Sequence, residues 1–198
     1  MAMLNNLAVD NSGENTGIIV GTNSGTINLL EHVVKIPSFI SVIVKKIGTF
    51  CYSDIDEESS ACNLIPFKPE EKLDYNRVIK YKEIIYQYST YYENCEQALN
   101  IYDNSHIGSK AKILNSVKLW YCKSKGTLLL ELKDSKLSDI EKIRNNSDRL
   151  IDEVINQIQC AINGSKDFSD TYFEELDLGI ICFVCYCFMK CKILERPI

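Results

Sequence analysis

The segment SDIEKIRNNSDRLIDEVINQIQCAING, residues 138–164, has the features of an amphipathic helix with both ends marked. Ser138 is a favourable N-cap, and Glu141 three residues later completes a capping box. Asn163-Gly164 is a common C-terminal stop. The apolar residues between these ends are Ile140, Ile143, Leu150, Ile151, Val154, Ile155, Ile158 and Ile162, and most of them recur at three- and four-residue steps. The segment therefore predicts one helix over the whole stretch.

Three other segments show the same periodicity. Residues 75–102 carry an apolar stripe, a second helix is predicted from near Ser109 to just before Gly126, and a last helix from Ser169 or Asp170 to about Leu194. The stripe consists of Val78, Tyr81, Ile85, Tyr88, Tyr92, Cys95 and Leu99. Four helices with short connections predict a mainly α protein in which residues 75–198 form a helical bundle domain.

The first 74 residues have a different pattern. Glycines recur at every fourth position from Gly13 to Gly25 and flank the β-type piece Ile18-Ile19-Val20. This pattern predicts a short β-hairpin-like arm over residues 1–30. Residues 31–74 are expected to be a mixed segment followed by an acidic connector. Periodicity does not choose between strand and helix for residues 29–50.

The composition indicates a folded, soluble domain. Of the 198 residues, 45% are hydrophobic and 25% charged, which is ordinary for such proteins. The formal net charge of -5 argues against a general affinity for nucleic acid. Residues 1–10 contain no basic side chain, so no export signal is expected. The longest apolar run, residues 178–189, is shorter than the roughly 20 residues of a membrane-spanning helix. We therefore expect a cytoplasmic protein without membrane contact.

One cysteine pattern resembles a metal site, and its members are Cys182, Cys185, Cys187 and Cys191. Four thiolates are able to hold zinc or an iron–sulfur cluster. On a helix, however, a rotation of about 100° per residue points two of them one way and two roughly the other, which favours a buried apolar helix. His32 and His106 lie in no recognised metal or catalytic motif. We expect no catalytic residue, no cofactor and no metal, while a redox or metal role for these cysteines stays open.

Other segments are suited to contacts with macromolecules. The Asn/Gly-rich arm is expected to add a strand to the sheet of another chain, although a flexible arm is the alternative. Its candidate contact residues are Asn11, Gly13, Asn15, Gly17, Ile19, Gly21, Asn23 and Gly25. Tyr81 and Tyr88 are further candidates, because tyrosine suits protein interfaces as well as helix packing.

A stretch without acidic residues, 104–130, holds a possible basic face. Its members are Lys110, Lys112, Lys118, Lys123 and Lys125. Such a face is able to contact DNA or the acidic surface of a partner. The simpler explanation is a solvated side of a helix.

Three segments occur in a suggestive order: the Asn/Gly-rich opening at 11–28, the helical stretch from Tyr75 to Tyr102, and the ending Cys191-Lys-Ile-Leu-Glu-Arg-Pro197. Together they resemble the small middle component of bacterial ABC three-component conflict systems, which include Lamassu-type anti-phage defence. The resemblance implies a non-catalytic accessory subunit that joins an SMC- or Rad50-like ABC ATPase to an effector, often a nuclease. Such a subunit belongs to a hetero-oligomer and meets DNA only indirectly or weakly. Cys191 and Ile193 are then candidates for the partner interface.

Two other functions remain open. One is a signalling adaptor that self-assembles through the N-terminal β element. The other is an enzyme that uses cysteine or metal chemistry, which stoichiometric zinc or iron in the purified protein would reveal.

Overall fold

The computed structural model describes residues 35–53, 68–166 and 172–197. All described residues belong to one compact unit, which begins at Val34. These residues are mainly helical, as the sequence predicts. The predicted β arm over residues 1–30, including the candidate residues Asn11 to Gly25, lies outside the described residues.

Eight α-helices and one turn of 3-10 helix occur in the described residues. They are α1 (Phe39–Ser53), α2 (Pro69–Tyr75), α3 (Lys82–Tyr88), η1 (Ser89–Tyr91), α4 (Tyr92–Ser105), α5 (Ser109–Glu131), α6 (Asp139–Arg144), α7 (Ser147–Asn163) and α8 (Phe173–Met189). A parallel β-bridge joins Ile36 to Ser165. None of the described helices combines the length and apolar character that a bilayer crossing requires.

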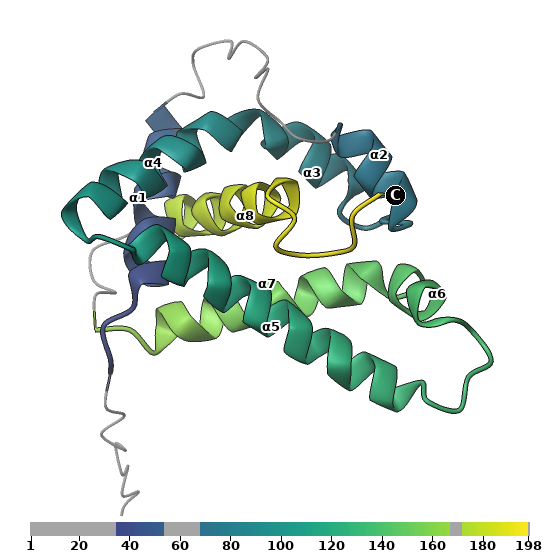
Figure 1. Cartoon of the computed structure of the whole chain (residues 1–198). Coiled ribbons are helices and arrows are strands. Elements are labelled where there is room, and N and C mark those ends of the chain that lie inside the picture. The colour runs from purple at the N-terminus through teal and green to yellow at the C-terminus, as the bar shows by residue number, and fades with distance from the viewer. Residues whose placement is uncertain (1–34, 54–67, 167–171, 198) are drawn as a thin grey trace, which may run out of the picture. The chain divides into compact units, whose positions relative to one another are not determined.

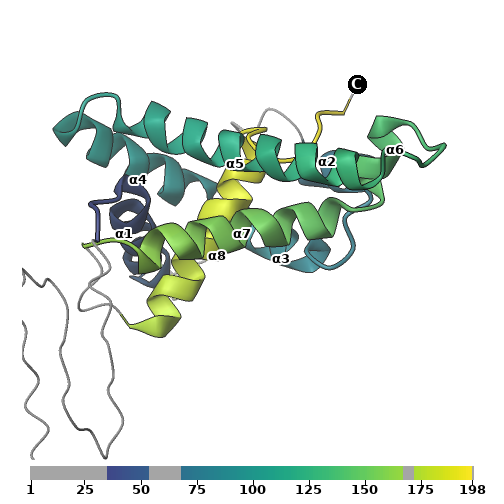
Figure 2. The same ribbon diagram turned by 90° about the horizontal axis from the view of Figure 1, so that it is seen from below.

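The last of these helices, α8, lies at the centre of the unit. It contacts α1, α3, α4 and α7. Figure 1 shows it between α4 on one side and the α5–α7 pair on the other, and Figure 2 shows it crossing α7 steeply. All residues from Cys182 to Met189 are buried, so this half of the helix is enclosed on every side. A helix that is apolar all round is stable only in such surroundings.

Two glycines bring α1 and α8 into backbone contact. A Cβ atom on Gly48 would lie 2.0 Å from the carbonyl oxygen of Glu175, and one on Gly179 would lie 2.2 Å from that of Val44. Real side chains do not tolerate such distances, so both positions require glycine for this close crossing. The sequence left residues 29–50 open between strand and helix. From Phe39 onward they are helical, because they form α1, which packs in the core.

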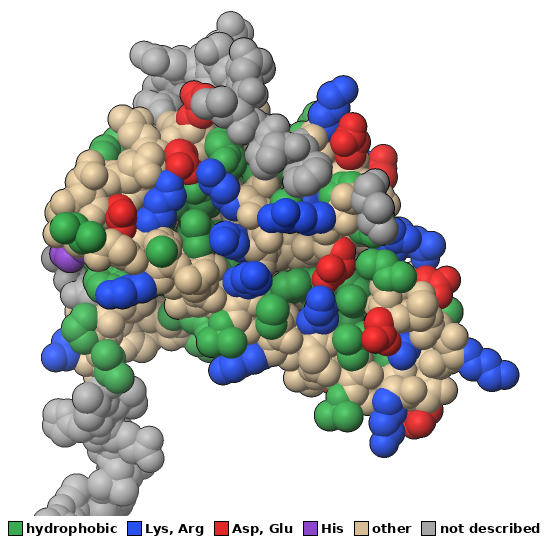
Figure 3. Space-filling view, viewed as in Figure 1, with side chains coloured by type: hydrophobic (Ala, Val, Ile, Leu, Met, Phe, Trp, Pro, Cys, Tyr) green, Lys and Arg blue, Asp and Glu red, His purple; other side chains and the backbone are tan. Residues whose placement is uncertain are grey.

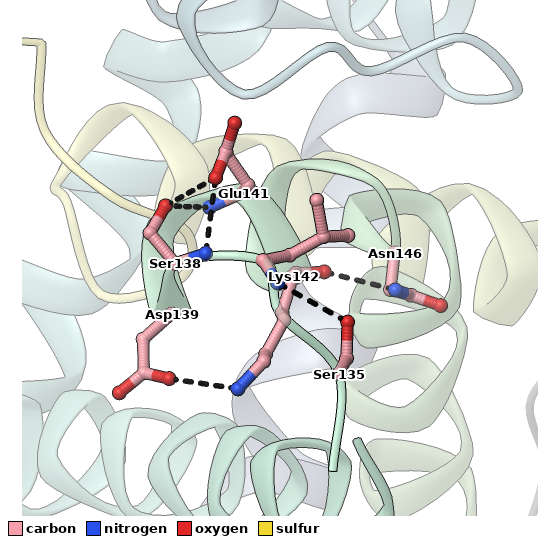
Figure 4. A network of polar contacts seen from close by, with 7 residues as sticks. Ser135, Ser138, Asp139, Glu141, Lys142 and Asn146 are labelled. Carbon is pink, nitrogen blue, oxygen red and sulfur yellow. Dashed lines mark hydrogen bonds and ion pairs between the residues drawn. The ribbon is translucent and has the colours of Figure 1, made fainter. Parts of the chain in front are cut away.

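The helix predicted for residues 138–164 is broken in the middle. The capping box is confirmed: the Ser138 side chain accepts from the Glu141 N–H, and the Glu141 carboxylate accepts from the Ser138 N–H at 3.0 Å (Figure 4). However, α6 ends at Arg144 and α7 begins at Ser147. The Asn146 side chain donates to the Lys142 carbonyl at 2.8 Å. Asparagine competes in this way for backbone partners, which explains why the helix stops here.

The stripe over residues 75–102 is also divided. Six of its seven residues are buried as predicted, and Tyr88 is partly buried. The backbone turns sharply at Arg77, which has a φ of 54°. The Asp148 carboxylate then accepts the N–H groups of Ile79 at 3.0 Å and Tyr81 at 3.4 Å, just before α3 begins. A partner from α7 therefore sets this helix start, which local sequence does not reveal.

Two predicted helix ends are wrong. The helix expected to stop before Gly126 continues to Glu131, because packing of Leu128 in the core outweighs the cost of an exposed glycine, about 1 kcal/mol. The last helix ends at Met189 instead of about Leu194. Cys191 has a φ of 52°, which no helix accommodates.

Candidate functional site

The C-terminal loop, residues 190–196, leaves α8 in a strained conformation. Cys191 and Leu194 have φ values of 52° and 60°. Residues with side chains rarely adopt positive φ, and such strain persists only where the surroundings enforce it. In Figure 1 the loop runs across the face between α2 and α5. Contacts with other parts of the chain therefore hold the loop in this conformation.

Two buried side chains of α2 and its C-cap hold the loop. Lys72 donates from Nζ to the carbonyl oxygens of Phe188 at 2.5 Å and Ile193 at 2.8 Å. The Asn76 amide donates to the Glu195 carbonyl at 2.8 Å and accepts the Glu195 N–H at 3.0 Å, as a neighbouring strand would. These hydrogen bonds fix the loop backbone at Ile193 and at Glu195.

Lys72 is an unusual residue for such a clamp, because its side chain is almost fully buried. None of the ion pairs among the described residues involves it. Burial lowers its pKa to about 8. Its charge is stabilised by the carbonyl end of α8 and by the Phe188 ring, whose centroid lies 4.2 Å from Nζ.

A cleft of about 500 Å³ opens between the C-terminal loop and α5. We call it the basic cleft. Its lining residues are Tyr75, Lys118, Tyr121, Cys122, Lys125, Cys191, Lys192, Leu194, Glu195 and Arg196. Four of these side chains are basic and one is acidic. Figure 3 shows Lys and Arg side chains gathered over the middle of this face.

The one carboxylate of the basic cleft is already bound. Glu195 accepts from the Tyr121 hydroxyl at 2.8 Å and from Lys125 Nζ at 2.7 Å. Burial opposes its ionisation, but these two partners hold its pKa below the ordinary value. Lys118, Lys192 and Arg196 form no ion pair with any described residue. The cleft therefore has an excess of positive charge.

A second surface lies at the other end of α8. Tyr172 and Phe173, which we call the aromatic ridge, are both 76% exposed. Phe173 borders two grooves, one of about 400 Å³ against α7 and one of about 550 Å³ against α3. Exposed aromatic side chains beside apolar grooves are typical of protein-binding surfaces.

The predicted interface residues do not gather in one place. Tyr88 borders the groove between α3 and α8. Tyr81 is buried, and its hydroxyl donates to Asp152 at 2.5 Å; burial raises its pKa to about 12. Cys191 borders the basic cleft, whereas Ile193 is buried beneath it. These four candidates thus belong to two surfaces and the core.

The five predicted basic residues also separate around α5. Lys118 and Lys125 line the basic cleft, and Lys123 lines a different hollow, beside α7. Lys110 binds Glu96 at 2.5 Å, and Lys112 lies 5.9 Å from the centroid of the Phe39 ring. The lysines of α5 point in different directions around the helix axis, because successive positions rotate about it. A stretch without acidic residues therefore does not by itself form a basic face.

Three of the four cysteines predicted on a buried helix are buried there, whereas Cys191 lies beyond the end of α8 and is partly buried. Cys182, Cys185 and Cys187 lie inside α8, and burial raises the pKa of Cys185 to about 12. Every described cysteine is free of a disulfide bond. Within the described ranges, no group of three or more His, Cys, Asp and Glu side chains is placed to hold a metal ion. His106 is exposed and stacks on Tyr102 with ring centroids 4.5 Å apart.

Three important residues were missed by sequence reasoning. Lys72 and Asn76 act on carbonyl groups more than a hundred positions away, and no local pattern marks them. The sequence does mark Phe173, because it is an aromatic residue beside the acidic residues of the first turn of α8.

Comparisons with models of protein families, with curated proteins and with solved structures find no match.

Proposed function

We propose that this chain is an accessory subunit that binds a helix of a partner protein at the aromatic ridge. The observation that carries the proposal is the exposure of Tyr172 and Phe173, together with the position of Phe173 at the border of two grooves. An amphipathic helix fits such a groove with its apolar side inward. Leaving two aromatic rings in water is costly for a protein without such a partner.

The surroundings of the ridge indicate the charge of that partner. Asp177 borders both grooves and Glu174 borders one of them. Electrostatic complementarity then favours a helix with apolar residues on one side and Lys or Arg at its margins. In this proposal Tyr88 contributes to the floor of the groove beside α3.

Two separate surfaces suit a bridging protein. The aromatic ridge lies at the start of α8 and the C-terminal loop follows its end, so the length of this helix, about 25 Å for 17 residues, separates them. Following the resemblance in the sequence, the two partners in this proposal are a cytoplasmic SMC-like ABC ATPase, whose coiled coil offers amphipathic helices, and an effector subunit. DNA is then met through the ATPase. The Asn/Gly-rich residues 11–28 serve as a short β element that extends a partner's sheet.

The test is co-purification with the products of neighbouring genes. Wild-type protein is expected to capture a long coiled-coil ATPase through the ridge. Phe173→Ser removes the central ring and is expected to reduce capture at least tenfold, since buried aromatic anchors dominate interfaces. Leu130→Ser is the matched control, because Leu130 is also exposed but lies on α5, away from the ridge.

The proposal fails if Phe173→Ser captures the ATPase as well as wild type does. It also fails if no neighbouring gene encodes an ATPase that binds. Circular dichroism of each variant checks that the fold is retained. Removal of residues 1–30 tests the β element separately, and unchanged assembly would exclude that part of the proposal.

A further inference from the structure

The basic cleft has a charge that the described chain does not neutralise. Lys118 projects from α5, while Lys192 and Arg196 come from the C-terminal loop. Glu195 is bound to Tyr121 and Lys125, so it is not free to pair with the other three. Three cations that face one hollow repel each other, and an anion placed between them relieves this repulsion.

We propose that the basic cleft binds a small phosphate-bearing ligand of nucleotide size. A volume of about 500 Å³ lies in the usual range of small-molecule sites. Phosphate oxygens match an arginine fork and several ammonium groups at once, because the group carries more than one negative charge and accepts several hydrogen bonds. The inference does not depend on the aromatic ridge or on its partner.

The cleft is rigid enough to be a site. The backbone of Glu195 is fixed by two hydrogen bonds to Asn76, and the Ile193 carbonyl is fixed by Lys72. The two basic side chains of the loop therefore start from a backbone that does not have to be ordered on binding, and this preorganisation lowers the cost of association. The strained residues Cys191 and Leu194 turn the loop toward α5.

Aromatic groups in the lining add a place for a base. The Tyr75 ring borders the basic cleft and is supported by the Arg144 guanidinium, 3.9 Å from its centroid. Arg144 thereby adds positive charge at the margin of the site. An aromatic ring backed by a guanidinium is a sequence-tolerant platform for stacking. A nucleotide would place its phosphates among Lys118, Lys192 and Arg196 and its base near Tyr75.

The experiment measures binding of sodium tripolyphosphate and ATP to the full chain by isothermal titration calorimetry at low and at physiological salt. Both probes are expected to bind, more weakly as salt increases. The double substitution K118Q/R196Q is expected to weaken the binding of both probes at least tenfold. Lys123→Gln is the matched control, since Lys123 is an exposed lysine of the same helix that lines another hollow. It should bind like wild type.

Three results would overturn the proposal. The first is that the folded wild-type chain binds neither probe. The second is that Lys123→Gln weakens binding as much as K118Q/R196Q does, which would indicate general charge attraction only. The third is that a 20-nucleotide single strand binds while both small probes fail, which would assign the surface to nucleic acid. Tighter binding of ATP than of tripolyphosphate would support a base contact, and Tyr75→Leu should abolish that difference.

Discussion

The two halves of α8 differ in sequence and in surroundings: the first carries Glu174, Glu175 and Asp177, whereas the second is apolar throughout. Both contain phenylalanine, yet Phe173 is 76% exposed and Phe188 is fully buried. The close crossing of α1 at Gly179 separates them. Beyond that crossing the helix lies inside the core, and before it the helix lies at the surface beside two grooves. The comparison shows that apolar residues form a core where neighbouring helices enclose them and an exposed surface where no described neighbour does.

The largest effect is expected from the same substitution at the two phenylalanines. Phe188→Ala should lower the free energy of unfolding by about 3–5 kcal/mol, because it leaves a cavity in the core. Phe173→Ala should change it by no more than about 0.5 kcal/mol, because the ring is mostly in water. Urea unfolding measures both. Equal losses would show that the two halves of α8 do not differ as described.

A slightly smaller loss is expected where the two halves meet. Gly179→Ala places a Cβ atom 2.2 Å from the Val44 carbonyl oxygen, and this oxygen belongs to a helix backbone that cannot move alone. We expect the free energy of unfolding to fall by about 3 kcal/mol, as measured by urea unfolding. An unchanged midpoint would mean that α1 and α8 do not touch at this point.

Lys72 at the enclosed end should make stability depend on pH. Its pKa is about 8 in the folded protein and near 10.5 in the unfolded chain. Between these values the unfolded chain holds more protons, so stability rises as pH increases through this window. The free energy of unfolding of the wild type, measured relative to that of Lys72→Met, should increase by about 2 kcal/mol between pH 7.5 and 10. Other lysines and tyrosines titrate in both proteins and cancel in this difference. A constant difference would contradict a depressed pKa.

The smallest effect is expected far from α8, at the glycine inside α5. Gly126 is exposed, and a Cβ atom there would meet nothing within 4 Å. Gly126→Ala should raise stability by about 0.5–1 kcal/mol, because alanine favours a helix. Thermal unfolding should show an increase of about 2–4 °C. A decrease would mean that α5 does not continue to Glu131, and Gly179→Ala provides the contrast of a glycine with no space.

Sequence alone predicts the parts of this fold that depend on neighbours along the chain. The capping box at Ser138, the buried stripe from Val78 to Leu99 and the burial of Cys182 follow from local spacing. The helix break at Arg77 does not, because it depends on Asp148 of α7. The break at Asn146 has a local cause, a side chain that binds the carbonyl of Lys142, but apolar spacing does not reveal it. Periodicity reports which residues are inside and is less informative about where a helix ends.

The candidate surfaces were harder to predict for the same reason. The sequence predicts Lys118 and Lys125 as parts of a basic face and Cys191 as a candidate interface residue, but their meeting in one cleft requires α5 and the C-terminal loop to be neighbours. The clamp by Lys72 and Asn76 joins positions separated by 116 to 121 residues. A lysine in an acidic connector gives no sign that it will be buried.

The central position of α8 has a consequence for synthesis on the ribosome. The apolar side of α1 packs mainly against α8, which emerges only after all the other described helices. At about 5–20 residues per second, α1 waits on the order of ten seconds for this neighbour. During that interval Ile43, Val44 and Ile47 have no α8 to cover them, so the nascent chain offers a hydrophobic segment that a chaperone is able to hold.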